Sequence, residues 1–410
     1  MPNITPDIEA FARIKVLGVG GSGGNAVSHM IASKVKGVDF IAINTDAQDL
    51  HRSLAKKRIH IGKNITRGLG TGMNPDLGRR AVEESKDELQ EAVKGADMVF
   101  VAGGLGGGTC SGASPQVART AKELGCLTVA VVTKPFYFEG RQRVRIAETA
   151  LEDLRKEVDA IIVIPNDKLL SAINKETTVK NAFAMCDEIL RQAVEGISDL
   201  ITTPGLINID FADIRTVMEN AGSALMGIGS ASGDNRAIDA AKAAINSPLL
   251  DVSIAGAKGV LFSIAGGEDL TMFEIQDAAK VITESIDPEA KIIFGTVRDD
   301  KLKKNEVKIT VIATGFPEGQ LPQRSTPTQT PEQSQANESS ILSFMKSGTA
   351  DKGKIFNPAP EPRRDRDAVI AEKITDVKKD AKPITPPPAQ ESSDDEWGAI
   401  PAFLRRSRLK

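Results

Sequence analysis

The sequence predicts an α/β fold: a Rossmann-like domain with a parallel sheet, a long central helix, a smaller α+β domain and a disordered tail. Three observations predict it. Runs of Val and Ile alternate with amphipathic stretches over residues 1–316, which is typical of parallel strands covered by helices on both faces. Two glycine-rich segments directly follow two of these runs. Finally, residues 317–410 hold 12 of the 21 prolines but only 4 of the 36 glycines, so a separate, less compact region begins there.

The strands of the first domain are predicted from its apolar runs. These are residues 13–20, 38–44, 96–104, 126–135 and 159–166. Helices are expected from about Asn25 and from about Ala113, each after a glycine segment. Apolar residues then recur at three- and four-residue spacing and predict the central helix: Val179, Phe183, Cys186, Leu190, Val194, Ile197 and Ile201. Strands alternating with helices in this way predict a doubly wound sheet.

The remaining chain divides by composition. We assign residues 1–176 to the first domain, 177–202 to the central helix, 203–221 to a loop and its following helix, 222–316 to the α+β domain, 317–392 to a linker and 393–410 to a terminal peptide. Strands at 257–266, 291–297 and 308–315 and a helix at 271–285 are expected in the α+β domain. The linker is rich in Pro, Gln, Ser and Thr, and such a segment buries too little apolar surface to fold alone.

Composition excludes several classes of function. The net charge of −3 and the 4% content of aromatic residues argue against nucleic acid, which needs a basic surface or stacking rings. Three cysteines without a CxxC pattern and three histidines without metal-site spacing predict neither a disulfide framework nor a protein-held metal. No apolar run approaches the roughly 20 residues of a membrane span, and no secretory signal is recognised at the start. We therefore expect a cytoplasmic protein without a transmembrane segment.

The first glycine segment, Gly18–Asn25, contains G-x-G-x-x-G after a predicted strand. Glycines let backbone N–H groups approach a phosphate at a helix N-terminus. The pattern is weak by itself, because a plain strand-to-helix turn can produce it. It also leaves open an NAD-dependent dehydrogenase, with Asp46 at the end of the second strand binding the ribose.

The second glycine segment, Gly103–Gly112, also lies between a strand and a predicted helix. Its backbone donors would face further phosphates at the same edge of the sheet. An ordinary dinucleotide fold does not need this second loop, and the sequence has no GxxxxGK[ST] motif of a P-loop. Cys110 interrupts the glycines. If its position required a positive φ, Cys would be strained there by about 1–2 kcal/mol.

The stretch GGGTCSG, residues 106–112, resembles the GGGTG[ST]G signature of the tubulin/FtsZ family of GTPases. The segments GVGGSGGNAV, FIAINTDAQDL, TRGLGTG, VVTKPFYFEG, VIPNDKLL, DEILRQAVEGISDLI and LINIDFADIRTVM resemble the FtsZ branch, whereas tubulin proper shares only the signature. The resemblance covers about Arg13 to Gly315 and the extreme C-terminus. It implies a GTPase that polymerises head-to-tail into filaments of the cytokinetic ring, at the bacterial division site beneath the inner membrane.

The resemblance also implies a GTP/GDP site. Its phosphate contacts would come from Gly21, Ser22, Gly23, Gly24 and Asn25 and from Gly107, Gly108, Thr109 and Cys110. Glu139 and Arg143 match the family's ribose and phosphate contacts, and Asn166, Phe183 and Asp187 match its guanine contacts. Mg²⁺ would accompany the nucleotide, and K⁺ is a further candidate cation.

Ser22 and Cys110 stand where the family more commonly has glycine. The Ser22 hydroxyl would add a phosphate donor. The Cys110 thiol would stay protonated beside phosphates. Because of Cys110, a GTP-binding filament scaffold with impaired hydrolysis remains an alternative function.

Asp210 and Asp213 taken alone are ordinary acids at the start of a helix. The resemblance implies instead that their loop completes the GTP site of the next subunit. There Asp210 and Asp213 would orient the attacking water and help to hold the cation, with Asn208 in support.

The terminal residues DDEWGAIPAFLRRSRLK, 394–410, place apolar side chains beside basic ones after a polar linker. This pattern is typical of a short motif that folds onto a partner's groove. It resembles the C-terminal peptide of the FtsZ branch, which implies membrane-tethering and regulatory partners similar to FtsA, ZipA or SepF.

Overall fold

The computed structural model of the chain describes residues 12–170, 177–203, 205, 207, 209–247, 254, 256–267, 269–299, 302–303 and 305–316. The predicted linker, 317–392, and the terminal peptide, 393–410, lie outside these residues. Within them, the predicted fold class is confirmed.

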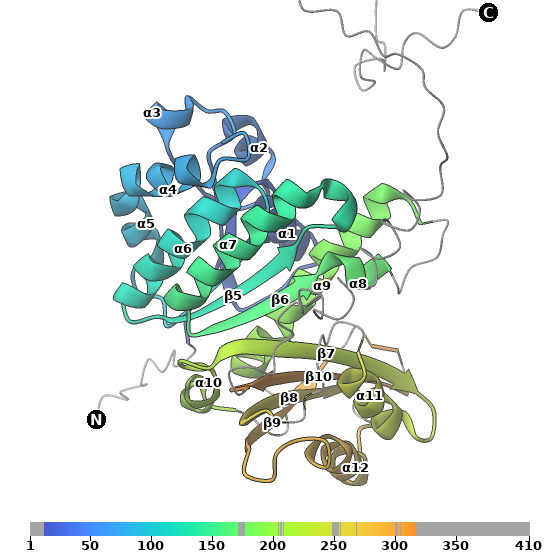
Figure 1. Cartoon of the computed structure of the whole chain (residues 1–410). Coiled ribbons are helices and arrows are strands. Elements are labelled where there is room, and N and C mark those ends of the chain that lie inside the picture. The colour runs from blue at the N-terminus through green and yellow to red at the C-terminus, as the bar shows by residue number, and fades with distance from the viewer. Residues whose placement is uncertain are drawn as a thin grey trace, which may run out of the picture. The chain divides into compact units, whose positions relative to one another are not determined.

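A parallel sheet forms the first domain (Figure 1). Its strands lie in the order β3-β2-β1-β4-β5-β6. Their bounds are β1 (Ile14–Val19), β2 (Val38–Asn44), β3 (Lys57–His60), β4 (Met98–Gly104), β5 (Leu127–Lys134) and β6 (Ala160–Pro165). All five predicted apolar runs are therefore strands. The short edge strand β3 was not predicted, because of its four residues only Ile59 is buried.

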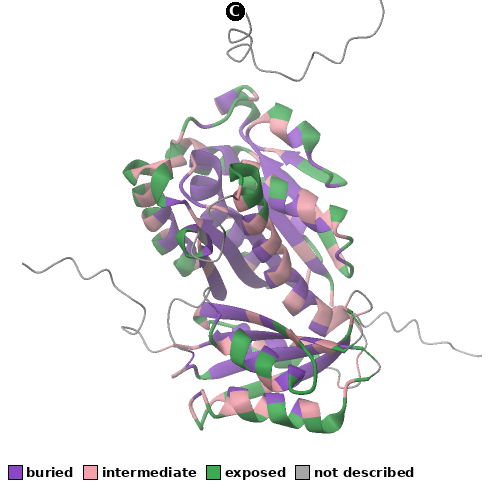
Figure 2. Cartoon of the chain, turned by 90° about the vertical axis from the view of Figure 1, so that its right-hand side faces the viewer, coloured by how far each residue is buried: buried purple, intermediate pink, exposed green. Residues whose placement is uncertain are grey.

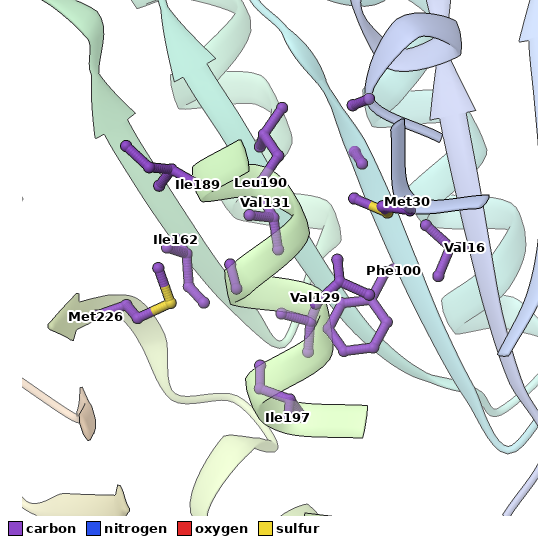
Figure 3. Close-up of a cluster of buried hydrophobic side chains, with 14 of the residues drawn as sticks. Val16, Met30, Phe100, Val129, Val131, Ile162, Ile189, Leu190, Ile197 and Met226 are labelled. Atoms are coloured by element: carbon purple, nitrogen blue, oxygen red, sulfur yellow. The ribbon is translucent and has the colours of Figure 1, made fainter. Parts of the chain in front are cut away.

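Helices cover both faces of this sheet. Alternate strand residues such as Val16, Phe100 and Val129 pack against α1 (Gly20–Ala32) and the central helix α9 (Val179–Thr202), as Figure 3 shows. The residues between them, such as Leu17 and Val99, form a second core under the helices of the other face. The remaining helices of the domain are α2 (Ala47–Arg52), α3 (Lys63–Thr66), α4 (Pro75–Glu84), α5 (Lys86–Val93), α6 (Gly108–Glu123), the 3₁₀ helix η1 (Tyr137–Glu139), α7 (Arg141–Glu157) and α8 (Asn166–Leu170). The domain is thus doubly wound, as predicted.

The second domain continues the sheet in the order β7-β10-β8-β9. Its elements are α10 (Phe211–Met218), β7 (Gly222–Ser232), α11 (Arg236–Ile245), β8 (Gly259–Gly266), α12 (Met272–Thr283), β9 (Lys291–Arg298) and β10 (Glu306–Thr314). β10 is antiparallel to β7 and β8, whereas β9 is parallel to β8. β7 joins the first domain through a short parallel pairing with β6. In Figure 2 the strands of both domains are largely buried, while the helices expose their outer faces.

Both glycine segments are helical for longer than expected. α1 begins at Gly20 rather than near Asn25, and α6 begins at Gly108 rather than near Ala113. The first four N–H groups of a helix have no partner within it. The glycine segments therefore supply N–H donors without a partner inside the helix, as first helical turns and not as separate loops.

Candidate functional site

A cavity of about 330 Å³ opens at the carboxyl-terminal edge of the parallel sheet. Gly104 ends β4, Lys134 ends β5, and Asn166 directly follows β6. This edge is where open α/β sheets bind ligands. Twelve of the predicted binding residues line the cavity: Gly21, Ser22, Asn25, Gly107, Gly108, Thr109, Cys110, Glu139, Arg143, Asn166, Phe183 and Asp187.

Two predicted residues, Gly23 and Gly24, do not line this cavity. A Cβ atom on Gly23 would lie 2.6 Å from the Ala102 carbonyl oxygen, so this glycine allows α1 to pack closely on the sheet. Gly24 lines a neighbouring hollow of about 320 Å³, which also includes Asn44 and Asp49.

The starts of α1 and α6 both line the cavity. Neither helix has an acidic residue in its first turn, so neither helix offsets the positive end of its own dipole. Together with the unpaired N–H groups, these positive ends favour an anion in this part of the cavity.

Ser22 connects the two glycine segments. The Gly104 N–H donates to Ser22 Oγ at 2.7 Å. This bond uses the hydroxyl oxygen as acceptor and leaves the hydroxyl hydrogen as a donor. Ser22 therefore both fixes the end of β4 and presents a donor to the cavity.

A cluster of threonines supports the signature segment and was not predicted. Thr109 Oγ1 lies 2.8 Å from Thr45 Oγ1 and 3.2 Å from Thr71 Oγ1. Thr71 lines the cavity. The only sequence signal for it was its place in the segment TRGLGTG, to which no contact was assigned. Thr133, at the end of β5, also lines the cavity without having been predicted.

Cys110 lies in the first turn of α6 and is not among the described residues with positive φ. The strain considered for it is therefore absent. Burial raises the pKa of its thiol to about 11, against the opposing effect of Ser114, whose Oγ lies 3.3 Å from Sγ. The thiol is protonated at neutral pH.

The three predicted guanine contacts, Asn166, Phe183 and Asp187, also line the cavity. Asn166 is 4% exposed, and its Oδ1 atom is buried without a hydrogen-bond partner. The Phe183 ring packs edge-on against Phe136, with 5.4 Å between ring centroids. Burial raises the pKa of Asp187 to about 6, although the His29 charge acts in the opposite direction. An unpaired carbonyl, an aromatic face and a partly desolvated carboxylate are suited to a planar heterocycle with N–H donors.

Glu139 and Arg143 form an ion pair at the wall of the cavity. Arg143 Nη1 donates to Glu139 Oε2 at 2.9 Å, and Glu139 Oε1 accepts from the Phe136 N–H at 3.0 Å. The pair presents both a guanidinium and a carboxylate to a ligand.

Asp210 and Asp213 lie at the opposite edge of the sheet. Both are exposed, and neither lines the cavity. Their helix, α10, lies near the amino ends of the parallel strands, because Arg215 Nη2 donates to the carbonyl of Gly125, which precedes β5. Gly222, which follows α10, likewise pairs with Ala160, the first residue of β6. Asn208 lies outside the described residues.

Among the described residues, no group of three His, Cys, Asp or Glu side chains is placed to hold a metal ion. In the same part of the chain, no helix combines the length and apolarity that crossing a membrane requires.

Comparison with known proteins gives two family matches. Residues 13–174 match the GTPase domain of the Tubulin/FtsZ family, and residues 222–317 match the C-terminal domain of the FtsZ family.

Among solved structures, an empty FtsZ dimer of M. jannaschii is 46% identical over 74% of this chain and 88% of that chain, with a TM-score of 0.71. A mutant FtsZ of M. jannaschii is 45% identical over 75% and 92%, with a TM-score of 0.72. CetZ2 of Haloferax volcanii, described as a GTPγS-bound protofilament, is 20% identical over 82% and 100%, with a TM-score of 0.64, and shows the shared fold alone.

These matches rule out the dehydrogenase interpretation. The structure agrees, because Asp46 accepts hydrogen bonds from the N–H groups of Gln48 and Asp49 as the cap of α2 and does not line the cavity.

Proposed function

The chain belongs to the tubulin/FtsZ family of GTPases, and on that premise we propose that it assembles head-to-tail into filaments that hydrolyse GTP at the contact between two subunits. The observation that carries this proposal is the separation of the cavity from Asp210 and Asp213, at opposite edges of one sheet.

The cavity suits GTP at both of its ends. The N-termini of α1 and α6, whose first turns carry no acidic residue, line the part of the cavity that we assign to the phosphates. At the base end, an ionised Asp187 would accept from N1–H and N2–H of guanine, a pair of donors that adenine lacks. The buried and unpartnered Asn166 Oδ1 would gain a donor from the base. Leaving such an atom unpaired is costly, so base binding relieves that cost.

Shared sites explain why the acids lie so far from their own cavity. If Asp210 and Asp213 lay against the cavity of a second copy, they would contact the terminal phosphate of the nucleotide bound there. They are too far from the cavity of their own chain to do so. Such a contact joins two different faces, so it does not close on itself and builds a filament. The FtsZ relative of M. jannaschii is described as a dimer, which supports self-association.

Exposed apolar side chains close in sequence to the cavity-lining residues Glu139 and Phe183 also support assembly. Tyr137 is 66% exposed, Phe138 63% and Val179 68%. Phe183, which lines the cavity, is 42% exposed. Large apolar groups gathered at one site mark surfaces that a partner covers. A second subunit seated there would bury them and close the cavity from water.

In hydrolysis, the chain's residues position groups and stabilise charge, as phosphoryl transfer requires. The helix N-termini and the Ser22 hydroxyl hold the phosphates. Asp210 and Asp213 of the adjoining subunit orient the attacking water and accept its proton. Mg²⁺, bound with the nucleotide and with K⁺ as a further candidate, would offset phosphate charge. After hydrolysis the interface loses a charged bridging group, which weakens it.

The greater identity to FtsZ than to CetZ2, 46% against 20%, favours the FtsZ role within the family: a filament of the cytokinetic ring, in the cytoplasm at the division site. The 394–410 peptide would attach the filament to membrane-tethering proteins similar to FtsA, ZipA or SepF.

The test is GTP hydrolysis per subunit against protein concentration, with light scattering followed in parallel. We expect turnover near zero at low concentration and a rise together with scattering above a threshold. Constant turnover at every concentration would show that the site is complete within one chain. Scattering that rises while turnover stays flat would favour the scaffold alternative.

A further inference from the structure

We propose that Arg215 is a positioning residue for hydrolysis, which holds the acid-bearing helix α10 against the amino-terminal edge of the GTPase-domain sheet. The inference rests on the proposed function, since Asp210 and Asp213 are taken to act on the nucleotide of the adjoining subunit.

Arg215 links α10 to the domain that carries the cavity. Its Nη2 donates to the Gly125 carbonyl at 3.3 Å, in the turn between α6 and β5. Its guanidinium carbon lies 5.4 Å from the centroid of the Phe211 ring, at the start of α10. A planar guanidinium held between a carbonyl and a ring fixes orientation better than a flexible ammonium. Asp213, only two residues before Arg215, takes its position from this contact.

The contact is poorly explained by fold stability alone. Arg215 Nε is buried and has no hydrogen-bond partner. A buried donor without an acceptor destabilises the folded state. An apolar side chain would fill the space without that cost, but it would not connect α10 to the Gly125 carbonyl.

A second link holds the other end of the helix at the same edge. Lys122 Nζ, near the end of α6, lies 3.0 Å from Asp159 Oδ1 and 3.4 Å from Asn220 Oδ1. Asn220 follows α10 with φ of 50°, a left-handed conformation that Asn tolerates. Asp159 is itself fixed, because its Oδ2 accepts from the Thr128 N–H at 2.9 Å. α10 is therefore attached to the GTPase domain at two points.

Loss of the Arg215 contact should displace α10 without unfolding it. Ile214 and Met218 are fully buried and Val217 is 5% exposed, which anchors the apolar face of the helix. On the side of the second domain, Thr314 Oγ1 donates to the Val217 carbonyl at 3.1 Å. Without Arg215, the link through Asn220 would still hold the far end of the helix, but the end that carries the acids would lose its bond to Gly125 and shift relative to the cavity-bearing domain.

The test compares Arg215→Ala, Arg215→Lys, Asp213→Asn and a control, Arg119→Ala, in the full-length chain. Arg119 forms an exposed ion pair with Glu157 and touches neither the cavity nor α10. We expect Arg215→Ala to lower turnover per assembled subunit by ten- to a hundredfold, since small misplacements of catalytic groups have effects of that size. Its KM for GTP and its assembly threshold should stay within about twofold of the parent. Arg215→Lys should recover part of the rate, and Arg119→Ala should match the parent.

Hydrogen exchange gives a second readout, because a loosened helix exposes its amides more often. Arg215→Ala should raise exchange in residues 212–218 but not in the helix starts that line the cavity. If Arg215→Ala hydrolysed GTP at the rate of the parent while Asp213→Asn was inactive, the inference would be overturned and the proposed function would stand. Parental turnover in Asp213→Asn would overturn both. A parallel rise in KM and in the assembly threshold in Arg215→Ala would reveal a general structural role and also overturn the inference.

Discussion

The two edges of the GTPase-domain sheet, at the carboxyl and the amino ends of its parallel strands, differ in how far their functional residues are buried and bonded to one another. At the carboxyl-terminal edge, many of the cavity residues are buried, and several are bonded to one another, as the Thr71–Thr109 and Ser22–Gly104 contacts show. At the amino-terminal edge, Asp210 and Asp213 are exposed at the N-cap and in the first turn of one helix. On the proposed function, one chain contains a preorganised site for binding a nucleotide but not the enclosed surroundings for hydrolysing it.

This difference has an electrostatic meaning. An exposed carboxylate interacts weakly with charges through water, whereas the same carboxylate in a closed interface interacts strongly. A subunit seated over the cavity would exclude water and bring the acids to the phosphates. Substitutions at the cavity edge should therefore weaken nucleotide binding, and substitutions at the acid edge should slow hydrolysis, each without the other effect.

The largest expected effect is at the acid edge. Asp213→Asn should lower GTP turnover by a hundredfold or more, because under the proposed function it removes the group that orients and deprotonates water. Nucleotide affinity measured by equilibrium titration should not change. Asp239→Asn, which alters an exposed acid in the first turn of α11, is the matched control. A loss of affinity in Asp213→Asn would remove the distinction between the two edges.

A smaller effect is expected at the cavity edge. Asp187→Asn should weaken GTP binding by ten- to a hundredfold, since a hydrogen bond to a charged group contributes about 1.5–3 kcal/mol. Turnover at saturating GTP should fall much less. Unchanged GTP affinity in this variant would show that Asp187 does not contact the base.

Asp187 also predicts a pH dependence. Burial raises its pKa to about 6, and guanine binding needs the ionised form. GTP affinity of the parent should fall about tenfold between pH 7 and pH 5, and Asp187→Asn should flatten this slope.

The folding stability of the nucleotide-free protein should depend on pH in the opposite direction to the GTP affinity. Burial raises the pKa of Asp187 in the folded state above its pKa in the unfolded chain. The neutral carboxyl group therefore contributes fully to stability at pH values below the unfolded-state pKa, and this contribution is lost as the pH rises through about 6. Urea unfolding at pH 7 should therefore find Asp187→Asn at least as stable as the parent.

The smallest effect on hydrolysis is expected at Cys110. Since Cys110 is helical and unstrained, Cys110→Gly should change turnover by less than about twofold. It should destabilise the fold by about 1 kcal/mol, because glycine is a poor helix former and the buried sulfur is lost. A severalfold rise in turnover would instead support the impaired-hydrolysis scaffold.

The sequence did not predict strand β7, whose glycines weaken the pattern that is typical of a strand. β7 was not predicted, because the segment GSALMGIGSAS has few β-branched residues. Its Gly229 lies so close to α11 that a Cβ atom would reach 2.5 Å from the Ala244 nitrogen. The glycine that weakens the strand signal is what lets the helix pack there, and only the packed structure reveals that reason. The predicted domain boundaries remain predictions.

The sequence by itself determined the strands of the first domain other than β3, the central helix and the two glycine-rich helix starts. These depend on local pattern: apolar runs make strands, and glycines after them place helix starts at one edge of a parallel sheet. Most of the cavity lining was instead implied by the resemblance to the tubulin/FtsZ family. Only the tertiary structure decided that Thr71 and Thr133 join the cavity, that Ser22 bonds to Gly104, and that Arg215 anchors α10. It also placed Asp210 and Asp213 at the far edge. These arrangements join segments distant along the chain, and no local pattern encodes which distant groups will meet.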